Sequence, residues 1–190
     1  MRPEIRNDDV LQIAAATKHQ LKCLEGRSFF DHFVGADEMF AEYNYPCILA
    51  VLAEGITFYP QWVEYIKKNK HRFKIELHGF NHINYRNLSK EELKSILGDS
   101  KKRIEDAFET EITTWYLPFG RKGENPYGEE VCQELGITYD KQTRKIDARL
   151  WLKHYQETKE SLFPHMNFHY WYKPQVDYVN KILCLLNEKN

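Results

Sequence analysis

Short apolar runs alternate with helical stripes of hydrophobic residues along most of the chain. Residues 47–53 form a continuous apolar run of the length expected for a buried strand. Residues 73–77 alternate between apolar and polar side chains, which predicts a second strand that ends where His78 begins. Further strands are predicted over residues 113–116 and 137–139. Strand and helix signals that alternate in this way are typical of an α/β domain with parallel strands.

Helices are predicted between these strands from capping residues and apolar spacing. Ser89 and Glu92 have the spacing of a capping box and precede an apolar stripe, so we expect a helix to begin there. The other predicted helices cover residues 37–43, 60–66, 126–135 and 174–186. Residues 141–164 show no clear pattern. The length and the absence of a linker indicate one domain over residues 1–190.

Composition and charge restrict the classes of partner. Of the 190 residues, 42% are hydrophobic and 29% are charged, and Lys plus Arg number 27 against 28 Asp plus Glu. This balance gives no indication of unspecific binding to nucleic acids or anionic membranes. No apolar run reaches the roughly 18 residues of a membrane span, and no signal-peptide pattern opens the chain, so we expect a cytoplasmic protein. Reduced thiols are expected because the cysteines are far apart, at Cys23, Cys47, Cys132 and Cys184.

Two neighbouring carboxylates, Asp8 and Asp9, follow a short extended stretch near the N-terminus. Adjacent side chains on an extended strand point to opposite sides, so one could bind a metal ion while the other accepts a proton. A solvated turn or a helix cap would explain the pair equally well. The pair alone therefore does not establish a function.

Two histidines four residues apart, His78 and His82, come directly after a predicted strand. In a helical turn both imidazoles would face the same way and could bind one divalent ion, whereas the alternative is a pair of loop histidines bonded to backbone. One aspartate and two histidines would supply the three protein ligands of an open catalytic metal site. The same ligand set would also suit ferrous iron in an oxygenase.

Two later segments could also carry chemistry. His165 and His169 repeat the four-residue spacing near the C-terminus; His169 could be a proton donor or a core histidine, and we expect a structural role for His165. The aromatic side chains at positions 168 and 170–172 indicate either core or a sugar-binding platform. The turn over residues 117–120 could direct a backbone N–H toward an oxyanion, although ordinary turns have the same sequence.

These four blocks, in this order, resemble the NodB-homology polysaccharide deacetylases, carbohydrate esterase family four. The family carries Thr-Phe-Asp-Asp-Gly, then His-Ser/Thr-x-x-His, then Arg-x-Pro-Tyr/Phe-Gly, and late in the chain Leu-x-His. The resemblance covers most of the chain and is densest from about Phe73 to Asp140. It implies a distorted, incomplete (β/α) barrel with seven strands, and one divalent metal ion that is usually zinc.

The resemblance also implies a reaction and the residues that carry it. The implied reaction removes an N-acetyl group from a sugar, a nucleotide-sugar or another glycan precursor. Asp8 would be the general base, His169 would protonate the leaving amine, and the backbone N–H of Phe119 would bind the oxyanion. The three implied metal ligands are Asp9, His78 and His82.

The sequence departs from the family pattern at several positions. Gly79 stands where the family has Ser or Thr, the residues flanking the aspartate pair differ, and no Asp-x-x-Asp-Trp segment is present. Tyr116 stands where the family has an arginine that orients the base, and Arg6 is close enough in sequence to Asp8 to supply that charge instead. A chain that kept the fold but lost the chemistry would be a non-catalytic carbohydrate-binding module, which is the main alternative.

Overall fold

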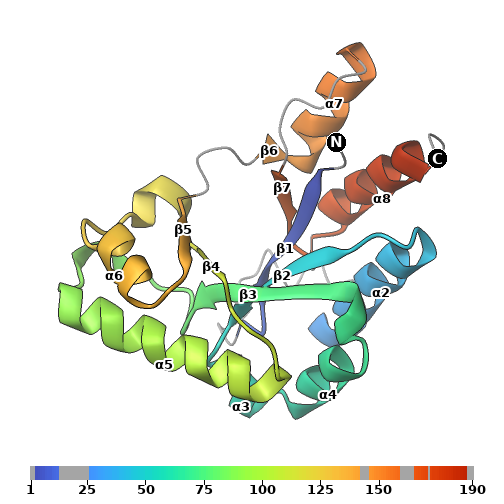
Figure 1. Cartoon of the computed structure of the whole chain (residues 1–190). Helices are drawn as coiled ribbons and strands as arrows, with labels where there is room; N and C mark the ends of the chain where they lie inside the picture. The colour runs from blue at the N-terminus through green and yellow to red at the C-terminus, as the bar shows by residue number, and fades with distance from the viewer. Residues whose placement is uncertain (1–2, 13–25, 142–145, 159–164, 171, 188–190) are drawn as a thin grey trace. The chain divides into compact units, whose positions relative to one another are not determined.

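The structure, a computed structural model, describes residues 3–12, 26–141, 146–158, 165–170 and 172–187 (Figure 1). These residues form two compact units. The central unit comprises residues 9–12 and 49–141, and the terminal unit comprises the other described residues, from both ends of the chain. Strands β1 (Glu4–Val10) and β2 (Cys47–Leu52) each supply residues to both units.

The described strands form a seven-stranded sheet in the order β5-β4-β3-β2-β1-β7-β6. β1 pairs with β7 and β7 with β6 in the terminal unit, and β3 pairs with β4 and β4 with β5 in the central unit; all four pairings are parallel. The carboxyl ends of parallel neighbours meet at one edge, where the following loops collect functional groups. The remaining strands are β3 (Phe73–Gly79), β4 (Thr114–Tyr116), β5 (Thr138–Asp140), β6 (Ile146–Asp147) and β7 (His165–Phe168).

The longest helix of the central unit, α5 (Lys90–Phe108), begins at the capping box that the sequence predicts. The Ser89 hydroxyl accepts a hydrogen bond from the Glu92 backbone N–H, and the Glu92 carboxylate accepts one from the Ser89 N–H at 2.8 Å. In Figure 1, α5 runs beside β3, and its buried stripe contributes to the core of this unit. The other helices of the unit are α3 (Gly55–Phe58), α4 (Pro60–Lys68) and α6 (Gly128–Glu134), with 3-10 turns at Lys70–Arg72, Tyr85–Asn87 and Gly120–Gly123.

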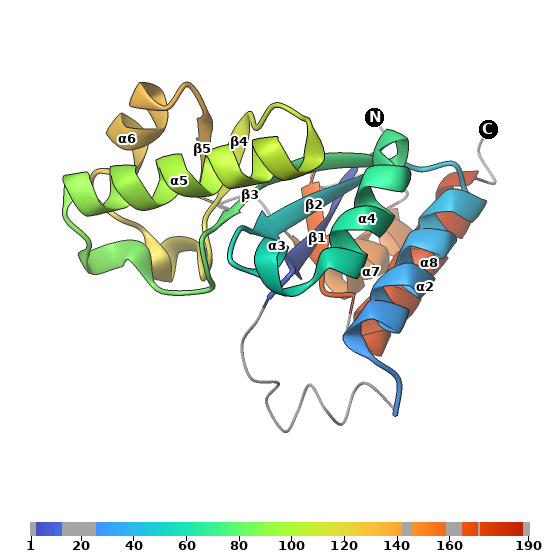
Figure 2. The ribbon, with the colours of Figure 1, turned by 90° about the horizontal axis from the view of Figure 1, so that it is seen from below.

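The terminal unit contains three helices in its described residues, α2 (Phe29–Glu42), α7 (Ala148–Thr158) and α8 (Lys173–Asn187). Figure 2 shows α2 and α8 side by side. Phe40 stacks on Phe168, with ring centroids 5.7 Å apart, and Trp151 stacks on Tyr155 at 4.9 Å. Phe168 is therefore a core residue, and Trp151, to which the sequence assigns no role, is structural.

Several element boundaries differ from the prediction. The helix predicted over residues 37–43 begins eight residues earlier, at Phe29, because Ser28 and Asp31 form a second capping box. β1 continues through the aspartate pair instead of ending before it, and β3 continues through Gly79. Residues 141–164, which show no pattern in the sequence, contain both β6 and α7.

The strand predicted over residues 73–77 is present as β3, and its polar residue Glu76 has a completely buried side chain. Its carboxylate accepts hydrogen bonds from the backbone N–H groups of Thr113 and Thr114, at 2.9 and 2.7 Å, and from the Thr113 hydroxyl at 2.6 Å. A strand of a parallel sheet is covered on both faces, so a polar side chain there must find partners inside the protein. Alternation in the sequence does not reveal such partners.

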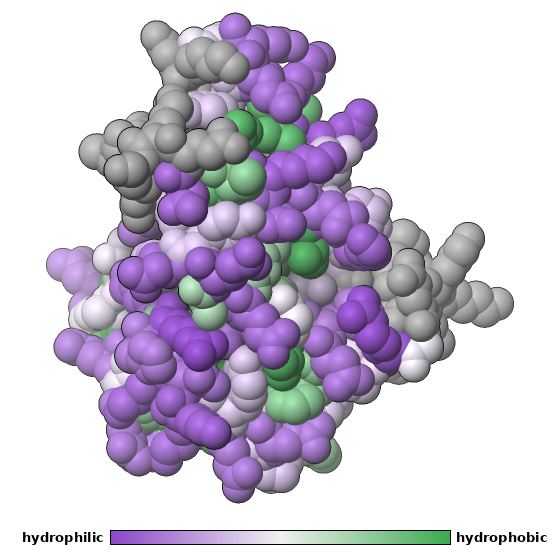
Figure 3. Space-filling model, turned by 90° about the vertical axis from the view of Figure 1, so that its right-hand side faces the viewer, coloured by the Kyte–Doolittle hydropathy of each residue, from purple (hydrophilic) through white to green (hydrophobic). Residues whose placement is uncertain are grey.

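The surface shows no extended apolar area on the face drawn in Figure 3, where hydrophobic residues appear as small patches among polar ones. Among the described residues, none of the helices has both the length and the hydrophobicity needed to cross a bilayer. Cys47 and Cys132 are buried and Cys184 is exposed, and no disulfide joins them. Cys23 lies outside the described residues.

Candidate active site

Asp9, His78 and His82 lie together in the central unit. Oδ1 of Asp9 is 3.3 Å from Nε2 of His78 and 3.2 Å from Nε2 of His82. One ligand atom from each residue lies within 4.8 Å of the other two. Two imidazole nitrogens and one carboxylate oxygen are a common ligand set for zinc and related divalent ions. The structure thus brings together the three predicted ligands in an arrangement that fits such an ion.

A hydrogen bond at the ring nitrogen that does not face Asp9 orients the imidazole of His78. Its Nδ1 lies 2.7 Å from the backbone carbonyl oxygen of Tyr116. A carbonyl oxygen can only accept a hydrogen bond, so Nδ1 carries the proton and the lone pair of Nε2 is on the side of Asp9. Tyr116, which occupies the position of the family's arginine, therefore supports the candidate ligand His78 through its backbone.

The segment from His78 to His82 does not form the predicted helical turn. His78 and Gly79 are the last two residues of β3, both buried, and Gly79 has a φ of +131°. A Cβ atom at position 79 would lie only 2.3 Å from the hydroxyl oxygen of Tyr85. Gly79 is thus required both by the backbone conformation and by the lack of space, which explains why Ser or Thr does not stand here.

Tyr85 holds this turn by its hydroxyl group. The hydroxyl accepts a hydrogen bond from the Phe80 backbone N–H and donates one to the Asn81 carbonyl, both at 2.9 Å. Burial raises the pKa of Tyr85 to about 12, so the phenol keeps the proton that it donates. Sequence reasoning missed Tyr85; the signal was a glycine inside the histidine segment with a tyrosine shortly after it.

Two residues at the end of β1 adopt left-handed backbone conformations. Asp9 has φ +61° and Leu11 has φ +66°. Aspartate tolerates this region, whereas leucine adopts it at a cost that surrounding contacts must offset. Gly55 permits one such contact, because a Cβ atom there would lie 1.9 Å from the Leu11 carbonyl oxygen. Strain that is enforced in this way is typical of a residue placed for function.

Asp8 belongs to the terminal unit and has a different set of partners. It is buried, and the Arg6 side chain binds both of its oxygens, with Nε on Oδ1 and Nη2 on Oδ2 at 3.0 Å. Arg6 and Asp8 are two residues apart on a strand, so their side chains share a face. Asn167, which is opposite Arg6 in the β1–β7 register, also donates to Oδ2 at 2.9 Å. The ion pair required by the Arg6 hypothesis is therefore present.

His169 directly follows β7, as predicted, and its ring is oriented by Gln175. Oε1 of Gln175 accepts a hydrogen bond from the His169 backbone N–H at 2.8 Å and lies 3.0 Å from Nδ1. The backbone donor identifies this atom as the amide oxygen, so Nδ1 must also donate to it. Nε2 is then the nitrogen that can gain or release a proton. Gln175 was not predicted, and the side chain of His165 lies outside the described residues.

Phe119 has a contact that the sequence did not predict. Its ring meets the His82 ring edge to face, with centroids 4.4 Å apart. The residue is half-exposed, and its φ of +61° gives the turn a left-handed backbone at this point. Phe119 thus covers one side of a metal ligand, while the oxyanion role of its N–H stays a prediction.

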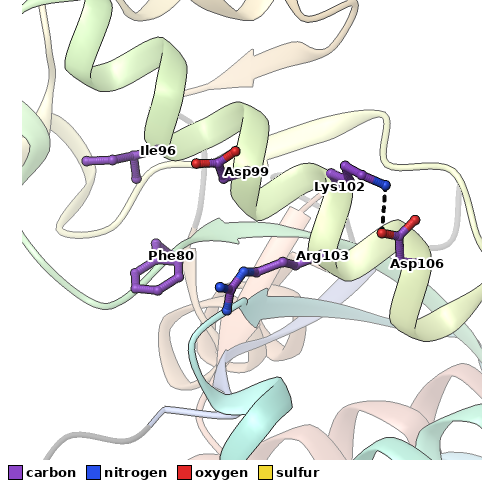
Figure 4. A pocket seen from close by; sticks show the side chains of 6 residues that line it. All are labelled: Phe80, Ile96, Asp99, Lys102, Arg103 and Asp106. Atoms are coloured by element: carbon purple, nitrogen blue, oxygen red, sulfur yellow. Dashed lines mark hydrogen bonds and ion pairs between the residues drawn. The ribbon is translucent and has the colours of Figure 1, made fainter.

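A surface hollow of about 530 Å³ also adjoins the histidine turn (Figure 4). In it, Lys102 pairs with Asp106 at 2.8 Å, and the Arg103 guanidinium lies 5.4 Å from the centre of the Phe80 ring. None of the three candidate metal ligands lines this hollow, and its positive and negative charges balance. The lining residues are Phe80, Ile96, Asp99, Lys102, Arg103 and Asp106.

A model of the polysaccharide deacetylase family matches residues 32–140, which is more than half of the chain. The chain belongs to the polysaccharide deacetylase family. The matched segment includes His78 and His82 but neither the aspartate pair nor His169, so the roles of those residues depend on their positions in the structure. A comparison with curated protein sequences found no match to this chain.

Solved structures show the fold of this family member. A carbohydrate esterase family 4 pseudoenzyme from Bacillus anthracis has a TM-score of 0.67 at 12% identity; the match covers 100% of this chain but 61% of that one. A peptidoglycan deacetylase from Bacillus subtilis has a TM-score of 0.65 at 16% identity, with 100% and 84% covered. A family 4 carbohydrate esterase from Streptomyces lividans, in complex with acetate, has a TM-score of 0.68 at 13% identity, with 99% and 88% covered. The predicted fold class, the incomplete (β/α) barrel of the deacetylases, is confirmed.

Proposed function

We propose that this protein is a metal-dependent hydrolase that removes an N-acetyl group from a sugar, a nucleotide-sugar or another glycan precursor. The observation that carries the proposal is the cluster of Asp9, His78 and His82, with His78 held by the Tyr116 carbonyl at 2.7 Å. A cluster with only a structural role would not need one aspartate in a left-handed conformation and two imidazoles around a single carboxylate oxygen. The expected ion is Zn²⁺.

Different residues of the chain would carry out different steps of the hydrolysis. A divalent ion bound by Asp9, His78 and His82 would acidify a water molecule and polarise the amide carbonyl. Asp8 would accept the proton of that water, because Arg6 and Asn167 hold it as an oriented carboxylate. Asp8 and Asp9 are consecutive residues, so base and ligand stay adjacent along β1.

The second half of the reaction requires a proton for the leaving amine. Nε2 of His169 would donate it, since Gln175 keeps the Nδ1 proton engaged at 3.0 Å. The N–H of Phe119 would stabilise the negative oxygen while the C–N bond breaks. The overall change consumes one water and yields acetate and the protonated amine, so atoms and charge balance.

A non-catalytic carbohydrate-binding module is the second candidate, and one observation favours it. Tyr116 replaces the arginine that the family's motif places beside the base. The ion pair between Arg6 and Asp8 weighs against this candidate, because it gives the carboxylate a guanidinium partner from another strand position. A two-histidine, one-carboxylate iron enzyme remains as an outcome of metal analysis.

Elemental analysis of the purified protein, combined with an acetate-release assay on a panel of N-acetylated sugars, tests the proposal. We expect one zinc ion per chain, and acetate release that stops on chelation and returns with added Zn²⁺. Protein that binds glycans but releases no acetate with metal bound would support the binding module. Bound iron with a requirement for a 2-oxo acid would support the oxygenase, and absence of a stoichiometric metal would overturn the hydrolase.

A further inference from the structure

The terminal unit contains a groove of about 630 Å³ between the beginnings of α7 and α8. These helices follow β6 and β7, which are parallel, so the groove lies at the edge where both strands end. His169, the residue after β7, is at the same edge. The groove is lined by Arg149, Leu150, Lys153, Tyr172, Pro174, Gln175 and Tyr178.

The two charged residues that line this groove, Arg149 and Lys153, are both cationic. Arg149 and Lys153 are four residues apart on α7, so they project from the same face of the helix. None of the lining residues just named is acidic. Glu157 approaches Lys153 only at 4.0 Å in an exposed pair, which screens the lysine weakly. Lys181 adds another positive charge beside the groove, 5.8 Å from the centre of the Tyr178 ring.

The rest of the lining suits a sugar ring. Tyr172 and Tyr178 combine a flat apolar face with a hydroxyl group, and Pro174 adds a further apolar surface between them in sequence. The sequence left the aromatic residues around His169 as either core or sugar platform. Phe168 and Tyr170 are buried, whereas Tyr172 is half-buried and lines the groove. The platform role therefore fits Tyr172, together with Tyr178 from α8.

Gln175 connects the groove to the proposed chemistry. It lines the groove, and its amide oxygen holds both the backbone N–H and Nδ1 of His169. A ligand that contacts Gln175 would thus lie beside the proposed proton donor. The volume lies within the range of small-molecule sites and accommodates one sugar with a charged substituent.

We propose that this groove binds the anionic part of the substrate, a phosphate or carboxylate group carried by an N-acetylated sugar. The proposal rests on the proposed function for its place in catalysis and names the substrate class more narrowly. Arg149 and Lys153 bind the anion, and Tyr172 and Tyr178 pack on the sugar ring. Neutral N-acetyl sugars would lack the first of these two contacts.

Calorimetric titration of the full chain with N-acetylglucosamine 1-phosphate and with N-acetylglucosamine tests the proposal without any turnover. We expect the phosphorylated sugar to bind at least about tenfold more tightly. N-acetylmuramic acid, which carries a carboxylate, and inorganic phosphate are further ligands that separate sugar-phosphate from sugar-carboxylate and simple anion binding. Equal affinities for the charged and neutral sugars would overturn the proposal.

Variants locate the effect in the groove. In R149Q/K153Q, the preference for the phosphorylated sugar should fall about tenfold, while Tyr178→Ala should weaken both sugars. Lys102→Gln, which removes one exposed positive charge from α5, is the control outside the groove and should change neither affinity. Retained preference in the double variant, with an unchanged melting temperature, would show that the groove is not the anion site.

The two proposals fail in different ways. Acetate release from the phosphorylated sugar that the double variant leaves unchanged would refute the anion groove but support the hydrolase. Binding of the charged sugar that depends on Arg149 and Lys153, without acetate release in the metal-loaded protein, would support the groove and refute the hydrolase.

Discussion

The candidate metal ligands of the central unit and Asp8 of the terminal unit are held by different means. His78 is oriented by a backbone carbonyl, and the turn that carries both histidines is held by the neutral hydroxyl of Tyr85. Asp8, in contrast, is bound by the guanidinium of Arg6 and the amide of Asn167. Asp9 therefore lies against two imidazoles, whereas the positive charge that balances Asp8 comes from β1 itself.

Because the supports differ, substitutions in the two regions should have different consequences for metal binding and for stability. Removal of a neutral support such as the Tyr85 hydroxyl should weaken metal binding and leave Asp8 in place. Damage to the charged support should affect Asp8 and the stability of the terminal unit while the metal ligands keep their geometry. Variants of each kind therefore test whether the two regions have separate functions.

His82→Ala should have the largest effect. It removes one of three protein ligands, so we expect metal affinity to fall by more than about 100-fold and acetate release to be lost with it. Metal content after dialysis and competition with a chelator measure the first effect. His71→Ala, at an exposed histidine in a 3-10 turn, is the control. Full metal content in the His82 variant would exclude the proposed centre.

Asp8→Asn should separate catalysis from metal binding. The asparagine keeps the shape of the side chain but cannot accept a proton as a carboxylate does, so turnover should fall by about 10² to 10⁴ while metal content stays at one per chain. Acetate release and elemental analysis of the same sample measure both. Unchanged turnover would remove Asp8 from the base role.

The sequence was sufficient to predict that Asp9, His78 and His82 lie together, because their spacing and order are local signals. His78 and His82 are four residues apart, and the aspartate pair is contiguous. The supporting residues could not be predicted in the same way. Asn167 reaches Asp8 only through the β1–β7 register, a contact between residues far apart in the chain.

Much of the fold was predictable for a similar reason. The strand of residues 47–53 and the capping box at Ser89 are strong local signals, and both are present in the structure. The conformation of Gly79 depends instead on the close approach of Tyr85, and α7 packs against α8 and β7. Propensity and periodicity do not encode such tertiary contacts.

Arg6→Ala should destabilise the protein. It leaves Asp8 buried without its ion-pair partner, which typically costs about 3–5 kcal/mol. Denaturant unfolding measures this cost, and metal content should not change. In the double variant R6A/D8N much of the stability should return, because no buried charge is then left unpaired. Equal stability of wild type and Arg6→Ala would show that the pair is not a support for Asp8.

Tyr85→Phe should have a smaller effect, confined to the metal ligands. Removal of the hydroxyl leaves the Phe80 N–H and the Asn81 carbonyl without this partner, and we expect metal affinity to fall about tenfold. Tyr127→Phe, at a half-exposed tyrosine of the same unit, is the matched control. A loss of stability with unchanged metal affinity would reduce Tyr85 to a purely structural residue.

Gln175→Leu should have the smallest effect on turnover, because it removes neither a proposed metal ligand nor the proposed base and acts on the His169 ring through a hydrogen bond. Without the amide oxygen, Nδ1 is no longer obliged to carry the proton, and both tautomers of the neutral ring become populated. Nitrogen-15 NMR of the His169 ring should show this mixture, and turnover should fall by less than about tenfold at unchanged metal content. Gln175→Glu keeps an acceptor oxygen at this position and should restore the single tautomer. A ring that keeps one tautomer in the leucine variant would mean that another group orients His169, and the proton donor would then have a different positioning residue.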